Sequence, residues 1–215
     1  NSQLVPEFAF FSDTVRDSIR GSNSNASKQG YVAGGGGFTS AIRDTFMGKA
    51  TWCKSPTQTV NYASCHDGYT LYDRLTLSMP ATNSSFQDIK RANNLAAAIV
   101  LTSQGVPFFQ AGEEILRTKD GDENSYKSSD AINNINWSVL KEGANEYEMM
   151  LYYQELIRVR KTYDIFRTLN TAVSANTSLG DGKAAITLDG HVGGKALIVS
   201  NPTGEEMTYT LTGSW

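Results

Sequence analysis

A histidine and an aspartate stand side by side at positions 66 and 67, within the segment VNYASCHDGYTLYDRL, Val60–Leu75. Residues Thr59–Ser64, just before the pair, predict a short strand in which alternate side chains share a face. A carboxylate beside an imidazole at the end of a parallel strand can hydrogen-bond sugar hydroxyls and stabilise an oxocarbenium-like positive charge. Taken alone, however, the dipeptide favours a plainer interpretation, a loop histidine beside a turn aspartate, because Asp-Gly is typical of turns.

Three other chemistries fit the sequence less well. A zinc site needs three or four ligands, whereas the chain has only His66 and His191, and His191 lies in DGHVGG, which predicts a hairpin tip on the surface. A Ser-His-Asp triad through Ser64 fails because adjacent strand residues point to opposite faces. The run Gly34–Gly37 lacks the Lys and Ser/Thr that follow a phosphate-binding loop.

Composition limits the class of protein. The 215 residues are 40% hydrophobic, enough for a packed core, and the net charge is −3, which disfavours nucleic acid as a partner. No apolar stretch approaches the roughly 20 residues that cross a bilayer. Cys53 and Cys65 are predicted to be two buried thiols rather than a disulfide. The chain begins with Asn, and we expect it to be a piece of a longer protein.

The elements that position His66-Asp67 are predicted from hydrophobic spacing. Helix and strand signals alternate with short joins, which indicates a parallel sheet. The clearest helix has Ser85 and Asp88 in a capping-box pattern and an apolar stripe from Phe86 to Val100. The predicted order is a buried strand Glu7–Phe11, a helix from Ser12 or Asp13 to Gly21, a helix Phe38–Phe46, the strand Thr59–Ser64, a helix Phe86–Ser103 closed by Gly105, and a strand Val106–Gly112.

The second half of the chain holds a long polar stretch, one more predicted helix and, after Arg167, a change of character. Glu113–Trp137 is long and polar, as functional loops often are. A helix is predicted over Asn145–Tyr163, with Met150, Tyr153 and Arg160 among the residues on one face. Short, partly alternating runs then predict an antiparallel β module. These runs are Lys183–Leu188, Ala196–Ser200 and Met207–Leu211.

Three segments resemble, in order and spacing, the type I pullulanase and glycogen-debranching branch of the α-amylase superfamily of glycoside hydrolases. The segment around His66-Asp67 is similar to the family's seventh barrel strand. Ala9–Ser22, AFFSDTVRDSIRGS, resembles the segment entered from its sixth strand, and Leu101–Trp137 resembles its eighth strand and the loop after it. The resemblance covers nearly the whole chain. Because the three segments also agree in order, the resemblance strengthens the chemical interpretation of the His-Asp pair.

The resemblance implies an α/β fold, the C-terminal part of a (β/α)8 barrel (about strands 6–8) followed by the start of an antiparallel β-sandwich domain. It places the barrel portion at residues 1–167 and a truncated all-β domain at 168–215. Three strands cannot close a barrel, so we expect an exposed sheet edge through which the fragment can self-associate.

The resemblance also implies roles for individual residues. Asp67 matches the family's transition-state-stabilising aspartate and His66 the histidine that binds the same sugar. Asn124 and Tyr126 match loop positions near the substrate cleft, where a structural role remains open. Glu114, just past the eighth strand, is interpreted as a structural network residue. The nucleophile and proton donor of this retaining family belong to strands that we expect upstream of the chain.

The expected parent protein is therefore a pullulanase-like glycoside hydrolase cleaving α-1,6 links in pullulan, starch or glycogen, and the fragment alone is expected to be inactive. Expected partners are α-glucan oligosaccharides or polysaccharides, with no nucleic acid and no membrane. No cofactor is implied and no metal site is identifiable, although calcium in the parent enzyme stays open. Two alternatives stay open, a non-catalytic glucan-binding or interaction module and isoamylase or glycogen-debranching specificity. The compartment of this bacterial-type enzyme, cytoplasmic or secreted, is not predicted.

Overall fold

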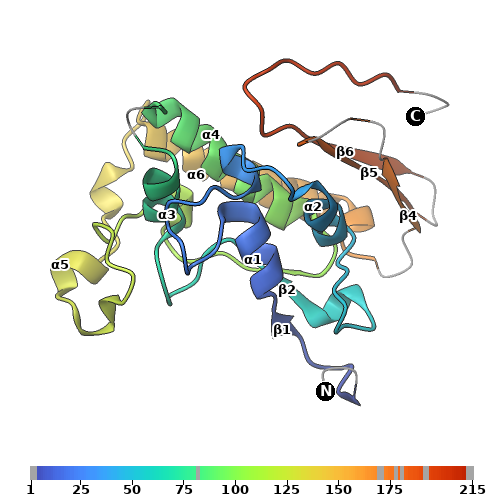
Figure 1. The fold of residues 1–215 in the computed structure, drawn as a ribbon, viewed down its shortest axis with the longest axis horizontal. Helices are drawn as coiled ribbons and strands as arrows, with labels where there is room; N and C mark the ends of the chain where they lie inside the picture. The colour runs from blue at the N-terminus through green and yellow to red at the C-terminus, as the bar shows by residue number, and fades with distance from the viewer. Residues whose placement is uncertain are drawn as a thin grey trace.

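The computed structural model describes residues 4–80, 83–168, 172–176, 179, 182–190 and 194–211. Two small sheets and the helices around them make up the structure (Figure 1). The interpretation of His191 as a hairpin tip lies outside the described residues. None of the described helices combines the length and apolar character needed to span a membrane.

Three short strands form the first sheet in the order β1-β2-β3, and all run parallel, which confirms the predicted sheet type. The strands are β1 (Phe10–Phe11), β2 (Thr59–Asn61) and β3 (Val106–Pro107). They are shorter than predicted, and in β3 Pro107 has no N–H to donate to the ladder. Central β2 is fully buried, as a strand between two neighbours should be.

The predicted burial of the first strand is wrong. Phe10 is 40% exposed and Phe11 is 52% exposed, because β1 is an edge strand of a sheet with only three members. Their rings still find edge-on aromatic contacts, Phe10 with Trp52 and Phe11 with Tyr62 and Phe108. The apolar run therefore marks a strand, but the described residues do not cover it.

Six α-helices are described, and four of them match predicted helices. The long helices α4 and α6 pack side by side, and α4 also contacts α2 and α3 (Figure 1). The helix α3 had not been predicted, and α5 is a single turn within the long polar loop. The helices are α1 (Asp13–Arg20), α2 (Thr39–Phe46), α3 (Leu71–Ser78), α4 (Phe86–Thr102), α5 (Asp130–Asn133) and α6 (Asn145–Thr162).

Helix α4 starts and ends as its sequence dictates. Ser85 and Asp88 form the predicted capping box, with reciprocal bonds to each other's backbone N–H. The predicted stripe is buried except for Phe86, which is 38% exposed. At the other end, the guanidinium of Arg160 donates to the carbonyls of Leu101, Ser103 and Gly105, which closes the helix electrostatically. Burial lowers the pKa of Arg160 to about 10.

Helix α6 buries most of the predicted face, with Met149 in place of Met150. Met149 is fully buried and Met150 is only half-buried, while Tyr153 and Arg160 are buried as predicted. Met149 and Tyr153 pack with Ala97 and Leu101 of α4 in a small apolar cluster. This cluster fixes the two long helices against each other beneath the end of β3.

The second sheet is antiparallel, in the order β4-β5-β6, as predicted for this part of the chain. Its strands are β4 (Ala172–Asn176), β5 (Ala184–Asp189) and β6 (Lys195–Ser200). Buried Ile186 and Leu188 of β5 share one apolar cluster with α2 and α4, so the sheet packs on the helices. The predicted strand at Met207–Leu211 is wrong, because these residues pair with no strand in the described chain.

Both cysteines are free thiols, as predicted, but both are partly exposed rather than buried. The Cys53 sulfur bonds locally to the backbone carbonyl of Ala50 at 3.2 Å. The Cys65 sulfur lies 3.5 Å from the carbonyl oxygen of Asp67, within the candidate segment. The two thiols therefore belong to separate loops.

We expect Gly105→Ala to destabilise the chain more than Gly121→Ala. Both glycines have a positive φ, +97° and +77°, which costs alanine about 1–2 kcal/mol. Only at Gly105 would the new Cβ clash, 2.4 Å from Thr59 Oγ1 in β2, and such overpacking adds roughly 1–3 kcal/mol. Urea unfolding of the two variants measures the difference. Equal losses would show that β2 does not constrain the α4–β3 connection.

Candidate functional site

His66 and Asp67 follow β2 at the carboxyl end of the parallel sheet. Their side chains are 86% and 88% exposed, and His66 Nε2 lies 3.4 Å from Asp67 Oδ1. Gly68, with φ +81°, turns the chain directly after them and packs near the Asn23 side chain. The two functional groups therefore project into solvent from a tight turn.

A buried lysine hydrogen-bonds to the backbone of the His66-Asp67 turn. Lys119 is 4% exposed, and its ammonium donates to the His66 carbonyl at 3.3 Å and to Ser125 Oγ at 2.7 Å. Burial lowers the pKa of Lys119, and the neighbouring Arg117 acts in the same direction. Lys119 thus joins the His66-Asp67 turn to the loop that carries residues 124–126.

Helix α3 fixes Lys119 in turn. Its buried Asp73 accepts from the Lys119 backbone N–H at 2.8 Å and from Thr118 Oγ1 at 2.5 Å. Thr70 caps the helix by accepting from the Asp73 N–H at 3.1 Å. The TLYD stretch after His66-Asp67 therefore has a structural role: it begins a helix whose first turn anchors the long loop.

The four residues singled out from sequence, His66, Asp67, Asn124 and Tyr126, line one cavity of about 220 Å³. Tyr126 is 74% exposed, and Lys127 Nζ lies 5.2 Å from the centre of its ring. Polar side chains make up the rest of the wall. These are Gln110, Arg117, Lys119, Glu123, Ser125 and Asn133.

The loop segment that carries Asn124 and Tyr126 is held by short-range bonds. Asp122 accepts from the Asn124 N–H at 2.9 Å and from Ser128 Oγ at 2.5 Å, and the serine bond lowers the pKa of Asp122. Asn133 of α5 donates to the carbonyls of Ser125 and Ser128. These contacts present the Tyr126 ring on the surface of an otherwise polar loop.

Buried cations hold the opposite side of the turn. Arg74 of α3 is fully buried and donates to the carbonyls of Ser22, Asn25, Ala26 and Lys28. Arg20 of α1 is also fully buried and donates to Asn23 Oδ1 at 2.6 Å. Burial lowers the pKa of Arg20 to about 10, with Arg16 and Arg74 adding to the effect. The loop beside Gly68 is therefore ordered by guanidinium groups.

A buried carboxyl group that sequence reasoning missed is bonded to Ser64, two residues before the pair. Glu113 is 5% exposed and accepts from Ser64 Oγ at 2.5 Å and from the Tyr153 hydroxyl at 2.9 Å. Asn93 of α4 in turn donates to the Tyr153 oxygen at 3.0 Å. Burial raises the pKa of Glu113 to about 7, against the lowering effect of the two hydroxyl donors.

The network role proposed for Glu114 thus belongs mainly to its neighbour. Glu114 accepts from the backbone N–H of Gly112 at 2.9 Å and is partly exposed. Two adjacent glutamates after an apolar run gave no signal of which one turns inward. The helical turn at Glu113–Ile115 determines which glutamate is buried, because it directs Glu113 toward Tyr153.

A second polar contact occupies the end of β1. Asp13 Oδ1 accepts from the Tyr62 hydroxyl at 2.6 Å and from Arg16 Nη1 at 3.0 Å. Asp13 itself is 70% exposed, whereas Arg16 is 12% exposed. The carboxyl ends of β1 and β2 are therefore joined by hydrogen bonds at the edge where the candidate pair lies.

The chemistry available at the cavity is hydrogen bonding and aromatic contact. Asp67 and Glu123 accept, Asn124, Gln110 and Arg117 donate, and Tyr126 offers a ring face. Within the described residues, no three His, Cys, Asp or Glu side chains gather where a metal ion would bind. A neutral polyhydroxylated molecule fits this combination, because its hydroxyls both donate and accept.

Known proteins resemble the chain over most of its length. The pullulanase of Bacillus subtilis (strain 168) is 34% identical over 181 residues, 80% of this chain and 24% of that protein. Pullulanase from Paenibacillus barengoltzii, in complex with maltohexaose and α-cyclodextrin, superposes with a TM-score of 0.87 and 31% identity over 96% of this chain and 34% of that one. Isoamylase from Flavobacterium sp is 25% identical over 146 residues, 58% of this chain and 18% of that protein.

No protein-family model matches the chain. The chain spans about a quarter of the length of the Bacillus subtilis relative. The similarity is therefore to one part of these larger proteins, the part whose fold the described residues share.

We expect the pH dependence of stability to report on Glu113. The native state holds a proton up to about pH 7, whereas the unfolded state releases it near 4.5, so stability is full below pH 4.5 and falls as pH rises through 7. The free energy of unfolding should fall by roughly 2–3 kcal/mol between pH 5 and pH 8 from this group. Glu113→Gln should abolish that fall in urea titrations.

Glu114→Gln is the matched control, because Glu114 bonds only a backbone N–H two residues away. It should retain the wild-type pH dependence. If the curves of wild type and Glu113→Gln run parallel from pH 5 to pH 8, the buried carboxyl does not titrate in this range and the assignment is wrong.

Proposed function

We propose, starting from the membership of this chain in the pullulanase-type group of the α-amylase superfamily, that it is part of a glycoside hydrolase cleaving α-1,6 branch linkages in pullulan, starch or glycogen-type α-glucans. One observation carries the proposal. His66 and Asp67, at the end of a parallel strand, line one cavity with Asn124 and Tyr126 from the loop after β3. The Paenibacillus barengoltzii relative is itself a complex with maltohexaose, which supports an α-glucan as ligand.

In this proposal Asp67 stabilises the transition state and His66 hydrogen-bonds the same sugar. The Asp67 carboxylate is 88% exposed beside the imidazole, so it is available to sugar hydroxyls. An oxocarbenium-like centre carries positive charge, which a nearby carboxylate stabilises. Lys119 holds the backbone of this turn, which preserves the position of both groups.

Asn124 and Tyr126, from the loop after β3, bind substrate in the same cavity. The Tyr126 ring is free on its exposed side to stack on the apolar face of a sugar. Asn124 supplies an amide that donates and accepts. The bonds of Asp122 and Asn133 position this segment before a ligand arrives.

The reaction is proposed to follow the retaining mechanism, with a nucleophilic carboxylate and a proton-donating carboxylic acid from outside these 215 residues. A proton donor needs an environment that keeps it protonated, commonly an apolar wall. The carboxylates of the cavity, Asp67 and Glu123, are both exposed to solvent. The 215-residue chain by itself is therefore proposed to be inactive.

The division of the fold is part of the same proposal. Residues 1–167 correspond to about strands 6–8 of a (β/α)8 barrel, with β1, β2 and β3 as those strands. Residues 168–215 correspond to the start of an all-β domain. The parallel sheet, the antiparallel sheet and the open edge at β1 support this assignment, and the open edge offers a route to self-association.

A second candidate is a non-catalytic glucan-binding module. The observation that favours it is a cavity rich in hydrogen-bonding groups and an exposed tyrosine, with no buried carboxylic acid among the residues that line it. The similarity to an isoamylase keeps isoamylase-like or glycogen-debranching specificity as a variant of the first candidate.

We expect Asp67→Asn to abolish debranching activity where the chain forms part of a complete enzyme. A chimera in which this chain replaces the matching segment of the Bacillus subtilis pullulanase provides that setting. Loss of the charge that stabilises the transition state should lower kcat on pullulan at least about 100-fold, with thermal unfolding unchanged. Asp44→Asn, an exposed aspartate of α2, is the control and should retain activity.

We expect the 215-residue chain alone to release no reducing sugar from pullulan while binding maltotriose in calorimetric titration. Measurable turnover by the pure chain would show that the nucleophile and proton donor lie within it. Absence of heat, with native circular dichroism, would remove the binding-module candidate.

For the chimera experiment, an inactive but folded Asp44→Asn chimera would show that the chimera is not a valid test of Asp67.

A further inference from the structure

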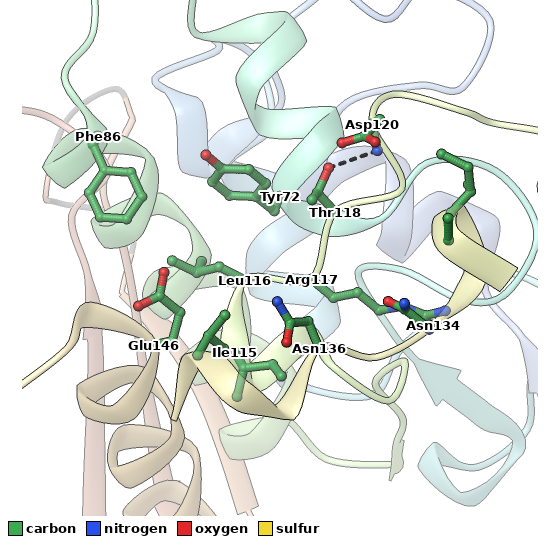
Figure 2. Close-up of a pocket in the computed structure, with 13 residues that line it drawn as sticks. Tyr72, Phe86, Ile115, Leu116, Arg117, Thr118, Asp120, Asn134, Asn136 and Glu146 are labelled. Carbon is green, nitrogen blue, oxygen red and sulfur yellow. Dashed lines mark hydrogen bonds between the residues drawn. The ribbon is translucent and has the colours of Figure 1, made fainter. Parts of the chain in front are cut away.

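A second cavity, of about 340 Å³, shares the lining residue Arg117 with the first. Figure 2 shows residues that line this second cavity. Its walls come from α3, the start of α4, the start of α6 and the loop on both sides of α5. The volume is in the range of small-molecule sites. None of the roles assigned to His66, Asp67, Asn124 or Tyr126 uses this space.

Two aromatic rings line one side of the cavity. Tyr72 stands in the first turn of α3 and Phe86 is the first residue of α4. In Figure 2 the rings of Tyr72 and Phe86 lie in the upper part of the view, and Asn136 and Glu146 lie below them. Phe86 is 38% exposed although it begins an otherwise buried stripe, so its ring is available to a ligand.

Hydrogen-bonding groups of both kinds face the same space. Among the described residues, the Tyr72 hydroxyl, the Asn134 amide and the carboxylates of Asp120 and Glu146 form no side-chain hydrogen bond with one another or with the rest of the protein. Asn136 uses its oxygen to accept from Ser138, which leaves its amide N–H groups. The wall thus offers acceptors, donors and rings together.

The backbone of this wall is strained. Leu116 (φ 56°) and Asp120 (φ 53°) are the two non-glycine residues with positive φ in the described chain, and both line the cavity. A bulky residue such as leucine rarely adopts this conformation, and strain of this kind concentrates at binding and active sites. The neighbouring bonds of Asp73 to Thr118 and Lys119 hold the segment in place.

We propose that this cavity is a second carbohydrate site, which binds a glucose unit of an α-glucan against the rings of Tyr72 and Phe86, with Asp120, Asn136 and Glu146 as polar groups of the same lining. The identity of the sugar rests on the proposed function. Two carboxylates disfavour an anionic ligand, whereas a neutral pyranose offers hydroxyls to them and an apolar face to the rings.

Arg117 and the adjacent Asn133 and Asn134 separate the two sites. The Arg117 guanidinium donates to the carbonyls of Ala111 and Asn133, so its polar end is fixed. Asn133 lines the first cavity and Asn134 the second. The two sites are therefore neighbours with separate reporters, Tyr72, Phe86 and Glu146 for the second, and His66, Asp67, Asn124 and Tyr126 for the first.

Titration of the 215-residue chain with maltotriose, followed by backbone amide NMR, tests the proposal. We expect saturable shifts at the reporters of both cavities. Phe86→Ala should weaken binding at the second site about fivefold or more and leave the first unchanged, since a stacked ring contributes on this scale. Glu146→Gln should weaken the second site alone, and Tyr126→Ala the first alone.

Leu77→Ala is the matched control, because Leu77 on α3 is 43% exposed and lines neither cavity. It should change neither site. Shifts confined to the first cavity would overturn the second site and leave the proposed function standing. Shifts confined to the second would leave the second site and remove the proposed roles of His66-Asp67. Absence of shifts at both, or a Phe86→Ala variant that binds like wild type, would overturn the inference.

Discussion

The buried carboxyl of Glu113 is the contact on which the arrangement around the site depends. It accepts from Ser64, two residues before His66, and from Tyr153 of α6, to which Asn93 of α4 donates. Burial of a carboxyl group costs free energy unless hydrogen bonds offset it, and here two hydroxyl donors do so. The group therefore ties the ends of β2 and β3 to the two long helices at one point. Movement of any of the four would leave a buried polar atom unpaired.

The loops around the site follow the same principle with opposite charge. Arg74 donates to four backbone carbonyls of the loop before α2, Arg160 to three at the end of α4, and Lys119 to the carbonyl of His66. Buried cations thus take the place of regular secondary structure, since a loop carbonyl without a partner is costly to bury. Hydrogen bonds from these cations hold the loops, and the backbone of the His66-Asp67 turn is anchored while its two side chains stay exposed.

Sequence patterns predicted the elements whose causes are local. The α4 capping box, the α6 helix and the parallel sheet required only spacing and end signals. Thr70 with Asp73 had the same cap signal as Ser85 with Asp88, but TLYDRL was interpreted as a motif and α3 was missed. Burial at β1 and the choice between Glu113 and Glu114 depend on tertiary neighbours, which spacing does not contain. The link between His66-Asp67 and Asn124-Tyr126 came from family resemblance alone.

The exposed rings at β1 connect these observations to the proposed assembly. Phe11, Tyr62 and Phe108 make edge-on contacts across the three strands while Phe11 stays half exposed. An apolar strand of this kind is stable when another layer or strand covers it, as neighbours in a closed barrel would. The same neighbours would bring carboxylates toward Asp67 and remove water from the cleft. Exclusion of water strengthens charge stabilisation, so in the proposed parent enzyme covering β1 and completing the proposed catalytic set would have one physical basis.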